Sequence, residues 1–473
     1  DRDYSLEEAI RKTAGRLRGA HAVVAINTQL SGDMVAFRIG NAGGIVVGYG
    51  NTEMFLSSDL PAVLPYTSKV AYLSGGELVY LSKHKASYTN LNGDPVQKQI
   101  SDVPDETISA AKGEYEHFML KEIHEQPEAV IYTMRGRVSF DPPNVSMDGF
   151  NLSDKIIRNT NRIVLLGMGT SLHAAMVGRN WIESMTNIPT EVDNSSEFRY
   201  RDPILDDKTL VISICQSGET ADTLAAMEKA AEKGAKLATL CNYEGTQTTR
   251  IADATLYIRA GLEIGVAASK TFICSLTALY ILSAYLGIKR DMIDSKGVAS
   301  LVRNLAHLPD MLGEACSNVS DYKRLAKQYA KYSNFLYIGR GILFPIAMEG
   351  ALKLKEISYI HAEGYQAAEM KHGPISLIDD TMPVLALIPQ DKLYEKMLSN
   401  ISEATARGGR VIAIATEGDN QIAEMTENVI YVPKSPDIVS PILMAVPMQL
   451  LAYYIALERG CDVDHPRNLA KSV

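Results

Sequence analysis

The sequence has few cysteines, and their spacing excludes several classes of protein. Only 5 of the 473 residues are cysteine; their number is odd, they are widely spaced and no Cys-X-X-Cys pair occurs. This spacing argues against a zinc site and against a disulfide framework. No other His or Asp pattern has the spacing of metal ligands, so we expect no metal ion, no organic cofactor and a cytoplasmic, reducing environment.

Long apolar segments and runs of basic residues are also absent. The longest apolar stretch, residues 441–457, contains two prolines and a glutamine. It is shorter than the roughly 20 residues of a membrane-spanning helix, so we expect a buried helix and no membrane partner. The net charge is −9, from 47 basic and 56 acidic residues. Without a basic cluster, nucleic-acid binding loses its usual electrostatic signature.

The composition that remains is typical of a soluble globular protein of several domains, with 46% hydrophobic and 22% charged residues. Residues 1–85 open with a helical pattern and continue as short β-rich segments between glycine, asparagine and serine. Residues 86–153 are polar, contain several prolines and are typical of a linker with one helical passage. From there on, apolar strands alternate with amphipathic helices, as in parallel α/β domains.

An internal repeat divides this second part of the chain. Residues 161–184 are echoed by residues 333–356, at an offset of 172 positions. Two further matches, 209–216 with 383–390 and 233–240 with 407–414, share an offset of 174 positions. Three matches in the same order predict two copies of one α/β domain, which we place at residues 154–290 and 325–460, with a C-terminal tail at 461–473.

Two loops of the first copy have the composition of an anion site. Gly167–Ser171 and Cys215–Thr220 each follow an apolar strand and precede a helix, where ligands of parallel α/β domains bind. Glycines let backbone N–H groups approach an anion, and Ser and Thr hydroxyls add donors beside a positive helix end. Because no dinucleotide or P-loop motif occurs, the loops favour a monophosphate over ordinary helix capping, which remains the alternative.

The second copy lacks such loops but has ionisable residues on the helix pattern around 351–363. Lys353 and Glu356 are three residues apart and share a helical face. His372 follows in a loop, directly before Gly373-Pro374. From composition alone, this helix could equally be a salt-bridged surface helix and His372 a loop histidine without a function.

Several of these segments resemble the isomerising glutamine–fructose-6-phosphate aminotransferases, the glucosamine-6-phosphate synthases. The likeness covers nearly the whole chain in order. Its motifs are KEIHEQPEAV (121–130), QSGETADT (216–223), EIGVA (263–267), ALKLKEISYIHAE (351–363), KHGP (371–374) and PRNLAKSV (466–473). The resemblance implies two tandem sugar isomerase (SIS) domains with flavodoxin-like parallel sheets, preceded by a β-rich remnant of an N-terminal-nucleophile glutaminase domain.

The resemblance also implies the catalytic residues for converting fructose 6-phosphate to glucosamine 6-phosphate. Lys471 of the PRNLAKS motif would form an imine at the C2 carbonyl, which acidifies the C1 protons. Glu356 would move a proton between C1 and C2, and Lys353 would keep it ionised. His372 would serve ring opening, reaching the site from a neighbouring subunit, which implies a homodimer.

The substrate-binding residues implied by the resemblance lie mostly in the two loops described above. They are Thr170, Ser171, Cys215, Gln216, Ser217, Thr220, Val266 and Lys353. Two positions depart from the family pattern. Cys215 stands where a phosphate-binding serine is common, and a thiol is a weaker donor than a hydroxyl. Ala268 replaces another usual serine.

The N-terminal 85 residues resemble only the second half of the glutaminase domain. Asp59, in the stretch SSDLPAVLPYT, would contact the amino group of glutamine. The family uses an N-terminal cysteine as nucleophile, whereas residue 1 here is Asp1 and the first cysteine is Cys215. We therefore expect a fragment of a longer enzyme, without glutamine hydrolysis of its own, that contains the synthase half and takes its nitrogen from glutamine or ammonia.

Two other functions remain open on the sequence. One is a ketose–aldose phosphate isomerase or an amino-sugar phosphate deaminase of the same fold, which the changes at Cys215 and Ala268 permit. The other is a regulatory sugar-phosphate-binding module without catalysis. Such a module needs the phosphate loops but neither Lys471 nor Glu356, so the presence of both favours an aminotransferase.

Overall fold

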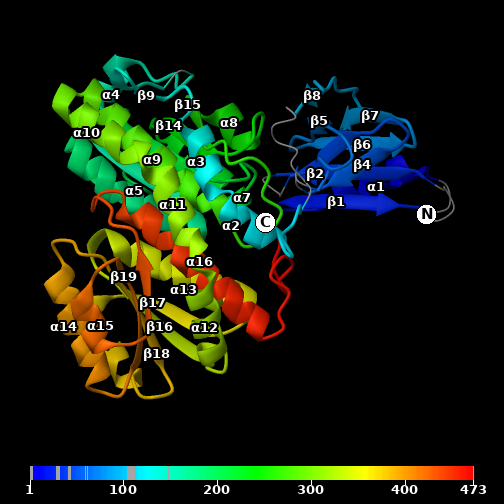
Figure 1. Cartoon of the computed structure of the whole chain (residues 1–473). Helices are drawn as coiled ribbons and strands as arrows, with labels where there is room; N and C mark the ends of the chain where they lie inside the picture. The colour runs from blue at the N-terminus through cyan, green and yellow to red at the C-terminus, as the bar shows by residue number, and fades with distance from the viewer. Residues whose placement is uncertain are drawn as a thin grey trace.

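The chain folds into a β-rich N-terminal region and two parallel α/β units (Figure 1). The computed structural model describes residues 4–27, 32–40, 44–58, 60, 62–103, 112–147 and 149–471. The N-terminal region, blue in Figure 1, lies beside the first α/β unit, and the red C-terminal tail returns from the second unit towards the place where they meet. The end of the chain thus lies beside segments hundreds of residues earlier.

The N-terminal region consists of helix α1 (Leu6–Ala14) and two antiparallel four-stranded sheets. Helix α1 begins at a capping box in which Ser5 and Glu8 satisfy each other's backbone N–H groups. In spatial order, one sheet contains β1 (His21–Ile26), β2 (Met34–Ile39), β6 (Glu77–Ser82) and β7 (Lys85–Asn90). The other contains β4 (Met54–Ser57), β3 (Val46–Tyr49), β5 (Lys69–Tyr72) and β8 (Ser101–Asp102). Strand β8 pairs with β5, so the sheets continue beyond residue 85 into the segment interpreted above as linker.

The connection to the α/β units is helical and buried. It contains α2 (Phe118–His124), α3 (Gln126–Met134), the short hairpin β9 (Val138–Phe140) and β10 (Pro143–Val145), and α4 (Asp154–Asn159). Apolar side chains of α2 and α3, such as Met119 and Val130, belong to the largest hydrophobic core, which they share with both α/β units. The linker is therefore an integral part of the packed structure.

The first α/β unit has a parallel five-stranded sheet with the strand order β12-β11-β13-β14-β15. The strands are β11 (Arg162–Gly167), β12 (Thr190–Asn194), β13 (Thr209–Ile214), β14 (Lys236–Cys241) and β15 (Ala254–Tyr257). The helices are α5 (Thr170–Thr186), α6 (Ser195–Phe198), α7 (Ala221–Glu232), α8 (Gln247–Ile251) and α9 (Lys270–Lys289). All six residues of β13 are buried, as expected for a parallel strand with both faces covered.

The second unit repeats this topology with the order β17-β16-β18-β19-β20. Its strands are β16 (Asn334–Gly339), β17 (His361–Gln366), β18 (Pro383–Ile388), β19 (Arg410–Thr416) and β20 (Val429–Val432). Its helices are η2 (Gly341–Leu343), α13 (Phe344–Ser358), η3 (Ala367–His372), η4 (Pro374–Leu377), α14 (Tyr394–Thr405), α15 (Asn420–Met425) and α16 (Ser440–Glu458). Three further helices join the two units: α10 (Ser295–Ala306), α11 (Leu308–Ser317) and α12 (Val319–Tyr329). The predicted fold class, two copies of a flavodoxin-like parallel α/β domain, is confirmed.

Long apolar helices form the junction between the two units. Helix α5 packs against α9 and α13, and α13 packs against α16. Two helices of the described residues, α9 and α16, are long and apolar enough to span a membrane, and 94% of the apolar window of each is buried inside the protein. The prediction of a buried helix at 441–457 is confirmed. For the segment 351–363, the sequence left a surface helix open as an alternative. The structure excludes it, because α13 lies inside this junction and residues 361–363 belong to strand β17.

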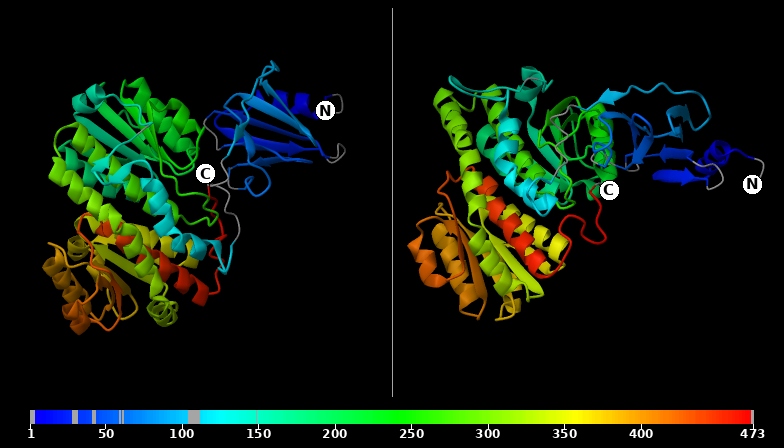
Figure 2. Two further views of the ribbon diagram at one scale, coloured as in Figure 1. Left: turned by 45° about the horizontal axis from the view of Figure 1, so that its top comes forward. Right: turned by 45° about the vertical axis from the view of Figure 1, so that its right-hand side comes forward.

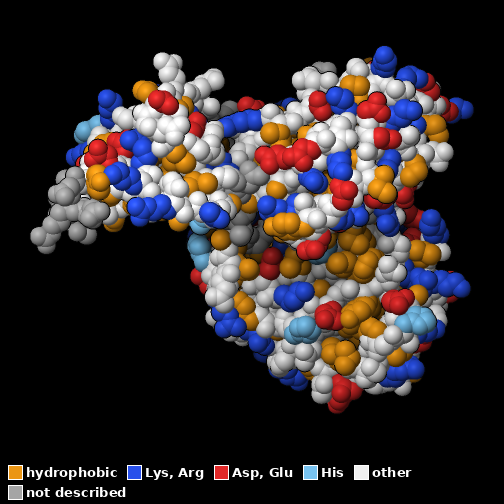
Figure 3. All heavy atoms as spheres, turned by 180° about the vertical axis from the view of Figure 1, so that it is seen from behind, with side chains coloured by type: hydrophobic (Ala, Val, Ile, Leu, Met, Phe, Trp, Pro, Cys, Tyr) orange, Lys and Arg blue, Asp and Glu red, His pale blue; other side chains and the backbone are white. Residues whose placement is uncertain are grey.

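Figure 2 shows the same arrangement from two further sides, with the N-terminal region projecting from the side of the body formed by the α/β units. Seen from behind, Lys and Arg side chains are interspersed with Asp and Glu side chains over this body (Figure 3). Neither sign of charge gathers into one large patch on that face.

Candidate active site

The two predicted phosphate loops lie side by side, because β11 and β13 are neighbouring parallel strands whose carboxyl ends meet at one edge. Thr170 and Ser171 form the first turn of α5, directly after the β11 loop. A Cβ at Gly167 would lie 2.8 Å from the backbone nitrogen of Leu172, so only glycine lets the helix begin this close to the strand. The hydroxyls and the helix end are thereby presented at the sheet edge.

The second loop is tight and holds its hydroxyls against one another. The Cys215 Sγ donates to Thr220 Oγ1 at 3.4 Å, and the hydroxyls of Ser217 and Thr220 are 3.5 Å apart. Gly218 has φ +66°, and a Cβ there would lie 2.1 Å from Thr246 Oγ1. The polar groups are therefore fixed by backbone geometry that requires glycine.

A cavity of about 60 Å³ brings five of the predicted residues together. Its lining includes Thr170, Ser171, Gln216, Val266 and Lys471, which come from the two loops, the segment before α9 and the C-terminal tail. Ala268 also lines the cavity, so the hydroxyl of the serine that is usual in the resembling family is absent from the cavity wall. The sequence thus identified residues from four separate segments that the fold places around one space.

Beside this cavity lies a buried ionic cluster that joins the two α/β units. The Lys353 Nζ is 2.7 Å from Glu356 Oε2 and 3.3 Å from Glu349 Oε1, and it donates to Thr170 Oγ1 at 3.2 Å. Thr170 Oγ1 in turn donates to Glu349 at 3.0 Å, and His173 Nδ1 lies 2.7 Å from the other oxygen of that carboxylate. Helix α13 of the second unit is therefore tied to the phosphate loop of the first.

Charge compensation keeps this cluster ionised although it is buried. Burial alone would lower the pKa of Lys353, but the Glu349 and Glu356 carboxylates outweigh it and raise that pKa above its usual value. Burial would likewise raise the pKa of Glu349, and the charge of Lys353 with the hydrogen bond from His173 lowers it. Glu356 is the member of the cluster with an appreciably exposed side chain (21%), which is the position that a proton-transferring carboxylate needs.

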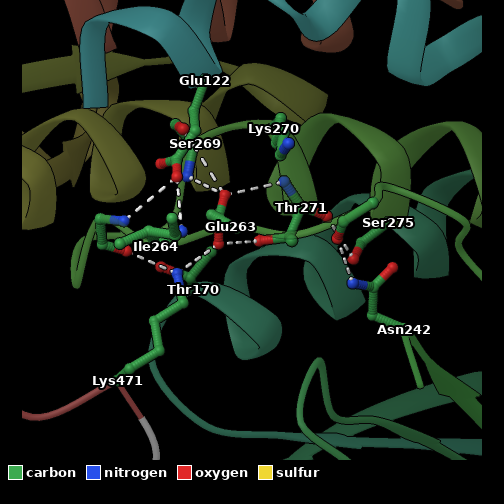
Figure 4. A network of polar contacts seen from close by, with 12 residues as sticks. Glu122, Thr170, Asn242, Glu263, Ile264, Ser269, Lys270, Thr271, Ser275 and Lys471 are labelled. Carbon is green, nitrogen blue, oxygen red and sulfur yellow. Dashed lines mark hydrogen bonds and ion pairs between the residues drawn. The ribbon is translucent and has the colours of Figure 1, made fainter. Parts of the chain in front are cut away.

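Lys471 is held at the edge of the cavity by the segment before α9 (Figure 4). Its Nζ donates to Glu263 Oε2 at 2.5 Å and to the carbonyl oxygen of Gly265 at 2.6 Å. Glu263 is fully buried and also accepts from the N–H groups of Ser269 and Thr271. Burial alone would raise the pKa of Glu263, but the charge of Lys471 and these hydrogen bonds outweigh it and lower the pKa to about 2.

Four residues of this arrangement were not predicted: Glu122, His173, Glu263 and Glu349. Glu349 precedes Lys353 by four positions, a spacing that could have signalled a helical ion pair. Glu263 is the first residue of the EIGVA motif itself. His173 follows the first phosphate loop on α5, and its buried contact with Glu349 gives it a structural role.

Of the predicted catalytic residues, His372 lies apart from both the cavity and the Lys353 cluster. His372 ends helix η3 and is exposed, and among the described residues it has no hydrogen bond or ion pair to the Lys353 cluster. Its neighbour Lys371 pairs with Glu403 on α14 of the second unit. Asp59 lies outside the described residues.

The described part of the chain holds no group of three His, Cys, Asp or Glu residues placed to bind a metal ion, and the five cysteines are not disulfide-bonded. What the cavity offers is a set of hydroxyl and backbone donors at a helix end, one primary amine and one nearby carboxylate. These groups can bind a phosphate, attack a carbonyl carbon and transfer a proton.

Comparison with known proteins assigns the class of both α/β units. The SIS domain model matches residues 156–284 and 328–459. The C-terminal domain of glucosamine-fructose-6-phosphate aminotransferase from Francisella tularensis superposes with a TM-score of 0.73 at 36% identity, covering 75% of this chain and 100% of that one. The protein is therefore a tandem SIS-domain protein.

Relatives that match nearly the whole chain identify the family to which it belongs within this class. Glutamine–fructose-6-phosphate aminotransferases (isomerising) from Aquifex aeolicus and Thermus thermophilus are each 45% identical over 99% of this chain, which spans 76% of their length. The chain belongs to this family of enzymes. A glucosamine-6-phosphate deaminase from Thermotoga maritima, with a TM-score of 0.60 at 20% identity, shares the fold alone.

Proposed function

We propose that this chain carries out the synthase half of the family's reaction, the amination and isomerisation of fructose 6-phosphate to glucosamine 6-phosphate. The observation that carries the proposal is the place of Lys471, whose amine lines the same cavity as Thr170, Ser171 and Gln216 of the two phosphate loops. A regulatory module that only binds a sugar phosphate has no use for an amine held at that point.

The phosphate group binds at the start of α5, where the hydroxyls of Thr170 and Ser171 meet the positive helix end. Ser217 and Thr220 contribute hydroxyls from the second loop, and the thiol of Cys215 takes the place of a third. Val266 lines the sugar side of the cavity. This arrangement fixes the phosphate and leaves the ketose carbonyl towards Lys471.

Catalysis begins when Lys471, having lost a proton, attacks C2 of the open-chain ketose, and water leaves as the imine forms. Ammonia then replaces the lysine at C2 and frees its amine. Glu356 removes a proton from C1 and returns it to C2, which leaves the nitrogen on C2 and a carbonyl at C1. The Lys353 Nζ lies 2.7 Å from Glu356 Oε2 and so places a positive charge against the carboxylate that accepts the proton.

The nitrogen reaches the site from the side of the N-terminal region. A second, smaller cavity of about 20 Å³ lies between that region and the first α/β unit. Lys471 and Gln216 line both cavities, and Val46, Leu60 and Tyr72 line only the smaller one. Ammonia, or nitrogen derived from glutamine, would arrive next to the imine carbon. His372 would serve the site of a second copy in a cytoplasmic homodimer.

The decisive experiment is borohydride trapping with fructose 6-phosphate, followed by intact-protein mass spectrometry of the chain and its Lys471→Ala variant. We expect a sugar-phosphate adduct that the variant lacks, and glucosamine 6-phosphate from added ammonium salt. No adduct, although calorimetry shows fructose 6-phosphate binding, would contradict the proposal and favour a binding module. Isomerised product that forms without ammonia would favour the ketose–aldose isomerase.

A further inference from the structure

Lys471 depends on the backbone of a short segment for its position. One of its two hydrogen-bond acceptors is a backbone carbonyl, that of Gly265, and the other is the side chain of Glu263 two residues earlier. Any residue that fixes the path of 263–265 therefore also fixes the amine. The segment lies between β15 and α9, outside regular secondary structure.

Glu122 of the linker helix α2 fixes that path. Its Oε1 accepts the backbone N–H groups of Ile264 at 2.5 Å and Gly265 at 3.1 Å. The side chain is buried, with 2% of Glu122 exposed. Figure 4 shows Glu122 and Lys471 approaching the segment around Glu263 and Ile264 from opposite sides.

The second carboxylate oxygen of Glu122 is unusual. Within the described residues Oε2 has no hydrogen-bond partner, although it is buried. It lies against Gly265, where an added Cβ would come within 2.9 Å of it. A buried acceptor without a partner costs stability, so this oxygen is held in place at the expense of the fold.

The C-terminal tail is tied to the same helix. The carboxylate of Asp464 accepts the backbone N–H groups of Phe118 and Met119 at 3.0 and 2.9 Å, at the start of α2. The backbone carbonyl of Asp464 accepts from the N–H of Val266 at 3.1 Å. Helix α2, segment 263–266 and the tail that carries Lys471 thus form one connected unit.

We propose that Glu122 is a positioning residue for Lys471, through which the linker helix α2 holds the imine-forming amine at the sugar-phosphate cavity. Its Oε1 fixes the Gly265 carbonyl that accepts from Lys471, and its unpartnered oxygen places a second carboxyl group beside Glu263. The consequence for catalysis rests on the proposed function, whereas the effect on the position of Lys471 does not.

The electrostatics of the unit agree with this role. Burial and the neighbouring charge of Glu263 raise the pKa of Glu122 to about 7, while Lys471, Lys270 and the N–H of Ile264 act in the opposite direction. Glu122 is therefore the carboxyl group near Lys471 that changes charge near neutral pH, whereas Glu263 stays ionised.

The first test measures the position of Lys471 without any sugar. The full chain and its variants are acetylated briefly with a limiting amine-reactive reagent, and labelling of Lys471 is quantified by peptide mass spectrometry. We expect Glu122→Ala to raise labelling by about fivefold or more, the change expected for the loss of a net hydrogen bond. Glu122→Gln, which keeps the carbonyl acceptor, should restore most of the protection, and the exposed Glu128→Ala on α3 should change nothing.

The second test follows the rate of borohydride trapping with fructose 6-phosphate. Glu122→Ala should slow adduct formation by about tenfold, the size of effect expected from misplacing a reacting group, while the Kd for the sugar phosphate stays within about twofold. Unchanged labelling in a folded Glu122→Ala variant would overturn the inference. Increased labelling with no adduct in the wild-type chain would support the inference and contradict the proposed function.

Gly265→Ala tests the same contact if Glu122→Ala does not fold. Its methyl group would meet Glu122 Oε2 and displace the segment from the other side. We expect increased labelling of Lys471 here too, although both hydrogen bonds to Glu122 Oε1 can still be formed by the unchanged Glu122 side chain. Equal labelling in the wild type and in Gly265→Ala would overturn the inference.

Discussion

At the scale of single residues, the site is organised around two buried lysine–carboxylate groups. Lys353 forms ion pairs with Glu349 and Glu356 inside the junction of the two units, and Lys471 forms an ion pair with Glu263 at the cavity edge. The first lysine has two carboxylates and stays an ammonium. The second is held by one ion pair and one carbonyl, and sits in the tail, so it can leave its partners when substrate enters.

Replacing Lys353 should destabilise the protein strongly. Lys353→Met fills the same space but leaves the buried Glu349 carboxylate and the partly exposed Glu356 carboxylate without their cation, and breaking a buried pair in this way costs about 3–5 kcal/mol. Urea unfolding measures the free energy of unfolding. The exposed Lys355→Met on the same helix is the matched control and should stay within about 0.5 kcal/mol of wild type. Equal midpoints for both variants would contradict the compensation described for the cluster.

Glu122 should make stability depend on pH in an identifiable direction. Its pKa is raised from 4.5 to about 7, so between these values the folded state keeps a proton that the unfolded chain releases. The free energy of unfolding therefore falls as pH rises through this window, by about 3 kcal/mol in total. Glu122→Gln has no titratable group at this position. Its free energy of unfolding should therefore rise relative to that of the wild type as the pH is raised from 5 to 8.

Glu125→Gln is the control for that measurement. The pKa of Glu125 is lowered: burial opposes ionisation, but Lys270 and Lys121 outweigh it. Its carboxylate is ionised in both states above pH 5, so the difference between Glu125→Gln and wild type should be constant from pH 5 to pH 8. A constant difference for Glu122→Gln as well would show that Glu122 is ionised throughout.

The sequence predicted some of these contacts and missed others for a physical reason. The Lys353–Glu356 pair follows from helical spacing, which is local. The contact of Glu349 with Thr170 and His173 joins residues about 180 positions apart, and no periodicity within one helix states which loop of the other unit it will meet. Glu122 was missed for the same reason, because its partners lie more than 140 positions away.

At the scale of elements, the two α/β units are alike in topology and different in chemistry. The repeat made both sheets predictable, and strand order and direction are the same in each. Each unit also needs a glycine where its first strand meets the following helix. A Cβ at Gly167 would lie 2.8 Å from Leu172 N, and one at Gly339 would lie 2.5 Å from Leu343 O. The duplication therefore supplies a matched pair of variants.

Gly167→Ala and Gly339→Ala should separate binding from turnover. The first displaces the start of α5 with Thr170 and Ser171, so we expect affinity for fructose 6-phosphate to fall by at least about tenfold in calorimetry. The second displaces the approach to α13, which carries Glu356, so affinity should stay within about twofold while the rate of glucosamine 6-phosphate formation falls. Equal loss of affinity in both variants would contradict a phosphate site confined to the first unit.

The burial of α13 was the feature of the elements that the sequence did not predict. Its charged residues, among them Lys353, Lys355 and Glu356, left a solvated surface helix open as an alternative. In the fold, α13 packs against α16 and α5, and the charged side chains on that face compensate one another. Composition cannot distinguish a salt-bridged surface from a buried ionic cluster, because both use the same residues at the same spacing.

At the scale of the whole molecule, the fold assembles one cavity from distant segments but leaves His372 outside it. The two loops, the segment before α9 and the C-terminal tail converge on the cavity, whereas His372 is exposed on η3. If His372 acts in catalysis, a second copy must bring it to the site. Each site of the proposed homodimer would then combine Lys471 from one chain with His372 of the other.

Subunit complementation tests this arrangement. Lys471→Ala and His372→Ala homodimers should each be inactive in glucosamine 6-phosphate synthesis from ammonium salt. When the two variants are mixed and allowed to exchange subunits, half of the dimers contain one chain of each variant. In such a mixed dimer, one site carries both substitutions and the other site carries neither. About a quarter of the wild-type activity should therefore return. A mixture that stays inactive although mass spectrometry shows mixed dimers would mean that His372 acts within its own chain, which would require η3 to move towards the cavity.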